Sequence, residues 1–340
     1  MKKKFKPLSL SVGIAIAILI LTSGCSLGLS RLPDTLEEQL EAGIDHGLDG
    51  IILCIQQPEA TQLYAAGWKN REQQLPADPY AFFKIASISK LYIAAAAAKL
   101  ISSGQLSLGS TLSDYLPELA GHIEYADEIT LEMLLRHRSG IPDYADHPDY
   151  PWTHPYAESS DTYELILDQP ADFKPGKRYA YSNTNYLLIG DLLDHVLGYS
   201  HHQYIQEHLL DPQGLVDTYH LLADVDMDEM MSGYFVGYEH DIKANDFVQP
   251  GGSMVATAED VAYFLRALKD GILLQPKEQV VYAAVYDYEH TGLLPGYQSI
   301  ARYDKELDAV VVLFVNTSGG NSWSKMETLY RRILRILKKQ

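Results

Sequence analysis

Cysteine is almost absent from this chain of 340 residues, which contains only Cys25 and Cys54. Two cysteines cannot form a disulfide framework or a cysteine-based zinc site. Cys54 lies within the apolar run Gly50–Ile55, where we expect it to be a small buried hydrophobic residue. A chain of this length has enough material for an ordinary hydrophobic core, in one large domain or in two closely packed ones.

Basic residues are also scarce, since 27 Lys and Arg stand against 45 Asp and Glu, for a formal charge of −18. Four of the basic residues, Lys2, Lys3, Lys4 and Lys6, lie in a segment that we expect to be removed, which makes the rest of the chain still more acidic. No part of the sequence forms a basic stripe. A nucleic acid is therefore not expected as a partner, because binding it requires clustered positive charge.

Two hydrolase signatures are missing as well. The chain has no Gly-x-Ser-x-Gly, which argues against an α/β-hydrolase. It has no His-Glu-x-x-His or other metal-ligand spacing, so a metal hydrolase is not favoured. The side chains that such a metal site would use lie in one long segment and are His137, Asp143, Asp146, His147 and His154. We expect neither a metal nor a cofactor.

The first thirty residues are typical of an export signal. Four lysines precede the uncharged run Leu8–Leu21, which is short for a membrane span. The next residues, Leu21-Thr-Ser-Gly-Cys25, resemble the bacterial lipoprotein box, although Thr22 replaces the usual aliphatic residue. We expect a signal peptide over residues 1–24 and a lipid on Cys25 that anchors the protein to a membrane of the cell envelope. An uncleaved anchor is the alternative, and it also places the protein outside the cytoplasm.

The order of the expected elements predicts the fold. Strands are expected at Gly50–Gln56, Thr61–Gly67, Val280–His290, Tyr297–Tyr303 and Ala309–Asn316, and helices at Thr35–His46, Ile85–Ile101, Ile129–Arg136, Thr162–Leu167, Thr184–Leu197, His201–Leu210, Thr257–Leu268 and Ser324–Leu337. This is an α/β (α+β) pattern, in which an antiparallel sheet from both chain ends is flanked by helices and a mainly helical subdomain is inserted. After a linker over residues 25–34, the α/β part would cover about 35–104 and 280–338, and the helical part about 105–279.

The expected helix Ile85–Ile101 carries the first chemical motif. Its residues 91–98 are uncharged and nearly all apolar, with five consecutive alanines, so the helix should be packed on all sides. Lys90 does not suit such surroundings, because a buried ammonium is costly unless its pKa falls. Ser87 lies three residues earlier, on the same face of the helix. A serine that can pass its proton to a partly desolvated amine is an activated nucleophile.

One other interpretation of this motif stays open. Ser87 could simply cap the N-terminus of the helix. A second Ser-x-x-Lys, Ser322–Lys325, occurs where a polar loop enters the C-terminal helix, and we interpret it as a chance occurrence.

Two later motifs add polar groups. Tyr181 and Asn183 are two residues apart, so in an extended backbone they project to one side and present a phenol and an amide together. Alternatively, Asn183 caps the helix that follows. His290-Thr291-Gly292 closes an expected strand, whose edge could offer backbone N–H groups to a substrate carbonyl, with glycine permitting close approach. Alternatively, it is an ordinary strand end.

Taken together, Ser-x-x-Lys, Tyr-x-Asn and His-Thr-Gly follow one another in this order, and each lies on the expected element. In this the chain resembles the serine β-lactamase/DD-peptidase superfamily, specifically its class C β-lactamase and DD-carboxypeptidase-like branch. The stretches Leu134–Tyr144, Phe173–Gly176 and Gly251–Asp260 add to the resemblance, which covers about residues 35–338. It implies a serine hydrolase that forms an acyl-enzyme with an ester or amide: a D-amino-acid peptide, a β-lactam or a small ester.

The resemblance also implies a role for each residue of the site. Ser87 would attack the carbonyl, Lys90 would take its proton, and Tyr181 would shuttle protons. The backbone N–H groups of Ser87 and Leu293 would form an oxyanion hole. Substrate contacts would come from Asn183, His290, Thr291, Gly292 and Leu293.

Two positions depart from the commonest pattern of this superfamily. His290 stands where most β-lactamases have lysine, so it supplies a cation only when protonated. Leu293 stands where members that recognise a carboxylate commonly have Ser or Thr, and it offers no hydroxyl. Both departures disfavour an anionic substrate, although peptidoglycan stays a candidate partner. The alternative function is a non-catalytic penicillin- or peptidoglycan-binding or sensor module on the same fold.

The lipoprotein interpretation predicts that the mature protein begins at lipidated Cys25. Cys25→Ala should release the protein from the membrane or stall its processing, because the acceptor of the lipid is lost. Mass spectrometry of the mature N-terminus and membrane fractionation measure both effects. An intact Met1 on the mature wild-type protein would contradict the prediction.

Overall fold

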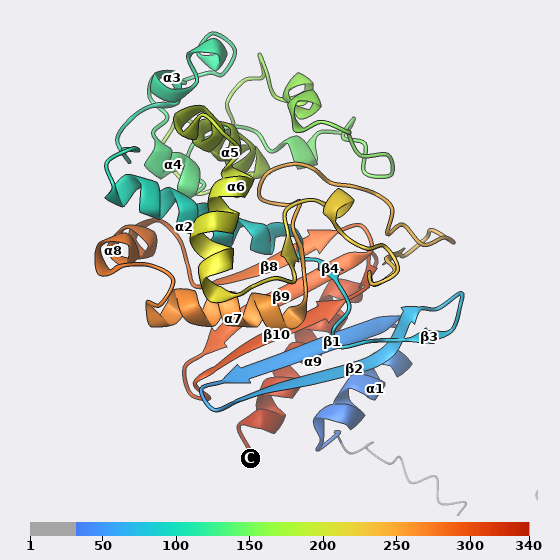
Figure 1. Ribbon diagram of the computed structural model, residues 1–340. Coiled ribbons are helices and arrows are strands. Elements are labelled where there is room, and N and C mark those ends of the chain that lie inside the picture. Colours follow the sequence, from blue (N-terminus) through green and yellow to red (C-terminus); the bar gives the residue numbers. More distant parts are fainter. Residues whose placement is uncertain (1–31, 340) are drawn as a thin grey trace, which may run out of the picture. The chain divides into compact units, whose positions relative to one another are not determined.

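The computed structural model describes residues 32–339 (Figure 1). The predicted signal peptide, the predicted lipidation site Cys25 and nearly all of the predicted linker lie outside the described residues. No helix between residues 32 and 339 combines the length and the apolar character needed to cross a membrane.

The strands are β1 (Gly50–Gln57), β2 (Ala60–Asn70), β3 (Leu75–Pro76), β4 (Phe83–Lys84), β5 (Thr218–Tyr219), β6 (Tyr234–Phe235), β7 (Val255–Ala256), β8 (Glu289–Leu294), β9 (Tyr297–Asp304), β10 (Ala309–Val315) and β11 (Thr317–Ser318). The α-helices are α1 (Leu36–Asp45), α2 (Ser89–Ser102), α3 (Leu112–Tyr115), α4 (Leu131–Leu135), α5 (Asn183–Leu197), α6 (His201–Ile205), α7 (Ala258–Asp270), α8 (Pro276–Val285) and α9 (Ser322–Leu337). Short 3₁₀ turns include η1 (Ala86–Ile88), η3 (Tyr144–Asp146) and η4 (Ser159–Leu165).

Six antiparallel strands form the main sheet, in the order β3-β2-β1-β10-β9-β8. Strand β1 pairs with both β2 and β10, so strands from the two ends of the chain lie side by side at the centre of the sheet (Figure 1). In the β1–β10 register, Ile52 lies opposite Phe314. The predicted antiparallel sheet built from both chain ends is confirmed.

Both faces of this sheet are buried, which explains the nearly continuous apolar sequence of its central strands. Residues 51, 53 and 55 of β1 pack in a cluster with α1 and α9. The alternate residues Ile52 and Cys54 pack on the other face, in the large cluster that includes α2 and α7. Cys54 is fully buried and unpaired, as predicted.

Helix α2 lies inside the large cluster, and its residues 89–98 are all buried. Its alanine run allows close packing, and the ring of Tyr92 stacks on Phe264 of α7 at 3.6 Å between centroids. The predicted helix Ile85–Ile101 is therefore correct in place, but its first turn is the separate turn η1. Gly104, beyond the C-terminus of α2, has the positive φ of 79° expected of a residue that ends a helix.

The predicted strand Val280–His290 is wrong over most of its length. Residues 276–285 form α8, which begins with Pro276 and a capping box between Gln275 and Glu278. Tyr282 and Val285, two of the residues that suggested a strand, are buried in this helix, which packs against α2, whereas Val280 is 72% exposed. Glu278 also pairs with Lys99 of α2 at 3.2 Å. The strand, β8, begins only at Glu289.

The middle of the chain covers one side of the sheet with helices and long loops (Figure 1). The predicted helix Thr162–Leu167 is instead the 3₁₀ turn η4, and the predicted helix His201–Leu210 changes after Ile205 into a π-helical turn. Loops from this region, together with the turn η1 and strand β8, surround a cavity of about 880 Å³.

Candidate active site

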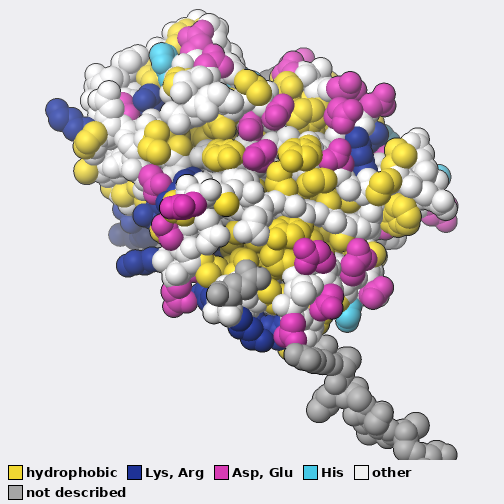
Figure 2. Space-filling view, turned by 60° about the horizontal axis from the view of Figure 1, so that its bottom comes forward, with side chains coloured by type: hydrophobic (Ala, Val, Ile, Leu, Met, Phe, Trp, Pro, Cys, Tyr) yellow, Lys and Arg dark blue, Asp and Glu magenta, His cyan; other side chains and the backbone are white. Residues whose placement is uncertain are grey.

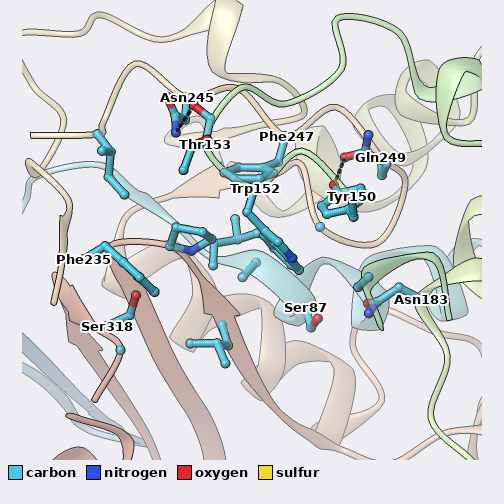
Figure 3. Close-up of a pocket in the computed structure, with 18 of the residues that line it drawn as sticks. Ser87, Tyr150, Trp152, Thr153, Asn183, Phe235, Asn245, Phe247, Gln249 and Ser318 are labelled. Carbon is cyan, nitrogen blue, oxygen red and sulfur yellow. Dashed lines mark hydrogen bonds between the residues drawn. The ribbon is translucent and has the colours of Figure 1, made fainter. Parts of the chain in front are cut away.

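Ser87, Lys90 and Tyr181 meet at the start of the central helix. Ser87 lies in η1, and its Oγ is 3.0 Å from Lys90 Nζ and 3.0 Å from the Tyr181 hydroxyl. No side chain caps η1 or α2, so Ser87 does not serve as the helix cap that was the alternative interpretation. Figure 3 shows Ser87 at the margin of the cavity.

The turn that carries Ser87 is held from several directions. Ser299 Oγ of β9 donates to the Ile85 carbonyl at 3.0 Å, and the Ile85 N–H donates to Met254. Ala86 has a φ of +52°, which is unfavourable for a residue with a side chain. Such strain persists only where the surroundings fix the backbone, and it is found mainly at functional sites. Ser89 points away, because its Oγ donates to the Ala86 carbonyl.

Lys90 is 1% exposed, yet its amine has three oxygen partners. Nζ lies 3.0 Å from Ser87 Oγ, 2.9 Å from Asn183 Oδ1 and 2.8 Å from the carbonyl oxygen of Gly251. Burial lowers the pKa of Lys90 from 10.5 to about 7, while the negative charge of Asp143 acts in the opposite direction. Near neutral pH this amine can therefore exist with or without its proton.

Asn183 connects Lys90 to a carboxylate that sequence reasoning had placed only among possible metal ligands. Its Nδ2 donates to Asp143 Oδ2 at 2.9 Å while its Oδ1 accepts from Lys90. Asn183 is the first residue of α5, and Ser182 occupies the cap position, so the capping alternative is wrong. Asp143 precedes Asn183 by 40 residues, and no spacing in the sequence indicates that the two are bonded.

Tyr181 is held by a second residue that sequence reasoning did not assign to this site, His137. The two rings stack with centroids 4.4 Å apart and planes inclined by 24°. His137 also bonds the backbone on both sides of Tyr181, because its carbonyl accepts from Ala180 N–H and its Nδ1 accepts from Ser182 N–H. Burial lowers the pKa of His137 to about 3, so the ring is neutral at physiological pH. Burial raises the pKa of Tyr181 well above 10, so it stays a phenol.

Strand β8 brings the third motif against η1. A side-chain carbon at Gly292 would lie 2.4 Å from the Ile85 carbonyl oxygen and 2.9 Å from the Ala86 Cβ, so only glycine allows this close approach. Leu293 is 55% exposed, and with His290 and Thr291 it lines the cavity. Burial lowers the pKa of His290 to about 3, well below the free value that the sequence suggests, so His290 is neutral at physiological pH.

The second Ser-x-x-Lys lies apart from this cluster, whereas two of the candidate metal ligands belong to it. Ser322 of the second Ser-x-x-Lys is buried in the first turn of α9, where its Oγ donates to the Gly319 carbonyl. Of the five candidate metal ligands, His137 lies under Tyr181 and Asp143 is bonded to Asn183. Between residues 32 and 339 no group of three or more His, Cys, Asp or Glu side chains is arranged to hold a metal ion.

The sequence and the fold match known proteins. A model of the β-lactamase family matches residues 33–287. The flp protein of Staphylococcus aureus (strain MW2) is 28% identical over 195 residues, which are 55% of this chain and 39% of the relative. The putative penicillin-binding protein PbpX of Bacillus subtilis (strain 168) is 23% identical over 329 residues, 86% of this chain and 76% of the relative. The chain thus spans about two fifths of flp and three quarters of PbpX.

The fold also resembles that of a D-amino acid amidase from Ochrobactrum anthropi SV3, solved with L-phenylalanine. The TM-score is 0.79 at 22% identity, and the match covers 89% of this chain and 98% of the amidase. The resemblance inferred from the three motifs, and the predicted fold class, are confirmed.

The geometry predicts how the reactivity of Ser87 depends on pH. The rate at which a fluorophosphonate modifies Ser87 should increase through about pH 7, because Lys90 can accept the serine proton only after losing its own. Asp143→Asn should move this transition to lower pH, because the lost carboxylate no longer raises the pKa of Lys90. The modification rate is measured by mass spectrometry across the neutral range.

Asp146→Asn is the matched control, since it removes a carboxylate from the neighbouring turn η3 and leaves the Asp143–Asn183 bond in place. A transition that Asp143→Asn leaves unmoved, or moves to higher pH, contradicts the inferred coupling. So does an equal displacement in the control.

Proposed function

Because this chain belongs to the β-lactamase family, we propose that it is a hydrolase in which Ser87 forms an acyl-enzyme with an ester or amide. The observation that carries the proposal is the position of Ser87 Oγ, 3.0 Å from both a buried amine and a phenol. A serine hydroxyl is a weak nucleophile by itself, and an adjacent base is the usual means of activating it.

Lys90 is the base in this proposal, because its hydrogen-bond partners favour that role. The carbonyl oxygens of Asn183 and Gly251 can only accept hydrogen bonds, so a neutral Lys90 amine donates both of its protons to them. Its lone pair then points to the third partner, the Ser87 hydroxyl, ready to accept that proton. Tyr181 cannot be the base in its resting state, because its raised pKa keeps the phenol protonated.

The proposed reaction has two steps. In the first, Ser87 Oγ bonds to the substrate carbonyl carbon, and its proton passes to Lys90. The bond to the leaving alcohol or amine then breaks, and the leaving group takes up the proton through the Tyr181 hydroxyl. In the second, water attacks the acyl carbon, a proton returns along the same groups, and the bond to Ser87 Oγ breaks.

The oxyanion of each intermediate would bind to the backbone N–H groups of Ser87 and Leu293. Strand β8 is an edge of the sheet, so alternate N–H groups of this strand point away from β9. Its close contact with η1 places Gly292, the residue before Leu293, against Ala86, the residue before Ser87. Removing one such donor commonly lowers the rate by about two to three orders of magnitude.

A substrate without a carboxylate suits the cavity best. Among residues 32–339 no Lys or Arg lines it, whereas Asp143 and Asp146 do. The neutral ring of His290 and the apolar side chain of Leu293 line the cavity at the two positions that the family resemblance assigns to binding a carboxylate. We therefore favour neutral esters and amides over penicillins and D-Ala-D-Ala peptides, and the amidase with a similar fold supports an amide substrate.

The location of the activity is proposed from the sequence alone. The basic and apolar start and the lipoprotein-like Leu21–Cys25 support an exported protein held in the cell envelope by a lipid on Cys25. Peptidoglycan would then be within reach of the protein. Its stem peptides carry a carboxylate, so they are the substrates whose hydrolysis should be compared with that of neutral esters and amides.

Labelling identifies the nucleophile. A fluorophosphonate should modify Ser87, and Ser87→Ala should abolish both the labelling and ester hydrolysis, whereas Ser322→Ala, in the second Ser-x-x-Lys, should preserve both. Peptide mapping of the adduct is the measurement. An adduct on any other residue rejects the mechanism, and a wild-type protein that is never labelled favours a non-catalytic binding module.

Leu293→Thr tests the preference for neutral substrates. The new hydroxyl should raise kcat/KM for a chromogenic cephalosporin by about tenfold, since a hydrogen bond to a charged group contributes about 1.5–3 kcal/mol. A short-chain nitrophenyl ester, which has no carboxylate, should gain little. A wild-type protein that already prefers the cephalosporin, or equal gains on both substrates, would show that the carboxylate argument is wrong.

A further inference from the structure

The cavity next to Ser87 has an aromatic wall formed by Tyr150, Trp152 and Phe247. The ring of Trp152 meets Tyr150 edge to face at 4.6 Å between centroids and lies 6.1 Å from Phe247. Tyr150 and Phe247 are buried, whereas Trp152 is 36% exposed and lines the cavity. Figure 3 shows Trp152 reaching into the cavity above Ser87.

A second apolar surface faces this wall. Phe235 of β6 packs edge to face on Tyr238 at 5.4 Å, and both line the cavity together with Leu293. Figure 3 shows Phe235 entering the cavity from the side away from Asn183. The space between the two surfaces is therefore apolar on both sides and continuous with the nucleophile.

The wall is fixed before any substrate arrives. Lys84 of β4 is 3% exposed, and its Nζ donates to the backbone carbonyls of Lys243 and Asn245, in the loop that leads to Phe247. Asn245 Nδ2 in turn donates to the Thr153 carbonyl at 3.4 Å, next to Trp152. A surface held in place by such bonds loses little conformational entropy when a ligand binds.

We propose that the acyl part of the substrate carries a bulky apolar group, and that Trp152 and Phe235 select it. This rests on the proposed acyl-enzyme at Ser87. The leaving group has to diffuse away before water attacks, whereas the acyl group stays bonded to Ser87 through both steps. A deep, preformed apolar site next to the nucleophile suits the part that stays. At about 880 Å³ the cavity far exceeds the volume of an acetyl group.

The test compares 4-nitrophenyl acetate with 4-nitrophenyl 4-phenylbutyrate, which share a leaving group and differ only in the acyl part. Wild type should prefer the phenylbutyrate in kcat/KM by about tenfold or more, because burying a phenyl-sized group removes a large apolar area from water. Trp152→Ala should lose most of this preference, and Phe235→Leu should reduce it.

Trp68→Ala is the matched control. Trp68 lies on β2, does not line the cavity, and is 38% exposed, close to the exposure of Trp152. This variant should keep the wild-type rates and the wild-type preference. Circular dichroism melting shows whether each variant is folded, and Trp152→Phe, which keeps an aromatic ring, should retain part of the preference if Trp152→Ala does not fold.

Binding to the inactive Ser87→Ala variant separates this inference from the proposed function. Calorimetry with 4-phenylbutyramide and with acetamide measures how much the phenyl-bearing acyl group adds to the binding affinity when no turnover takes place. Tighter binding of the phenylbutyramide, lost in Ser87→Ala/Trp152→Ala, supports the apolar site even if the wild type hydrolyses nothing. The inference is overturned if the wild type hydrolyses both esters with equal kcat/KM. It is also overturned if Trp68→Ala removes the preference as much as Trp152→Ala does. In both cases the proposed hydrolase activity is still supported.

Discussion

The site depends on the burial of one amine, that of Lys90, at the start of the closely packed helix α2. Removing an ammonium from water costs several kcal/mol, and Lys90 is fully enclosed. Three oxygen partners and the charge of Asp143 offset part of this cost, which leaves the pKa of Lys90 at about 7. The packing of α2 therefore sets the protonation state that the chemistry needs.

Two glycines make this packing sterically feasible. Gly251 has a φ of +81°, and a side-chain carbon there would lie 3.1 Å from Lys90 Cγ and 2.8 Å from Tyr186 Cβ. Residue 251 can thus bring its carbonyl oxygen to the Lys90 amine only because it is a glycine. Gly292 does the same for the approach of β8 to η1. The rigid sheet and helix hold the reacting groups, while the loops that carry Trp152 and Phe247 shape the space for the substrate.

The chemistry-bearing residues could be predicted because each stands in a short local pattern. Ser87 and Lys90 share a helical face, and their meeting with Tyr181 follows from the order of motifs in the family. The sheet was predictable for a similar reason, since the nearly continuous apolar run of each central strand is a local pattern. Residues 280–285 were misassigned as a strand because β-branched and aromatic residues such as Val281 and Tyr282 are typical of strands, and only the contact of α8 with α2 shows that they belong to a helix.

The supporting residues could not be predicted, because their partners are distant in sequence. Asp143 orients Asn183 across 40 residues, and Lys84 holds a loop that begins about 160 residues later. A polar side chain taken alone does not reveal which backbone carbonyl or amide it meets. The pKa of His290 could not be predicted from the sequence either, because it is set by burial among rings such as that of Tyr286, which stacks on His290 at 5.9 Å between centroids.

The pairing of β1 with β10 has a consequence for how the protein is assembled. Ile52 and Phe314 are neighbours in the sheet although more than 250 residues separate them, so the sheet closes only when nearly the whole chain is available. Ser87 and Lys90 are synthesised about 200 residues before the strand that faces them, β8. A partly made chain thus holds its nucleophile in an unfinished site, and reactivity begins only with completion of the fold.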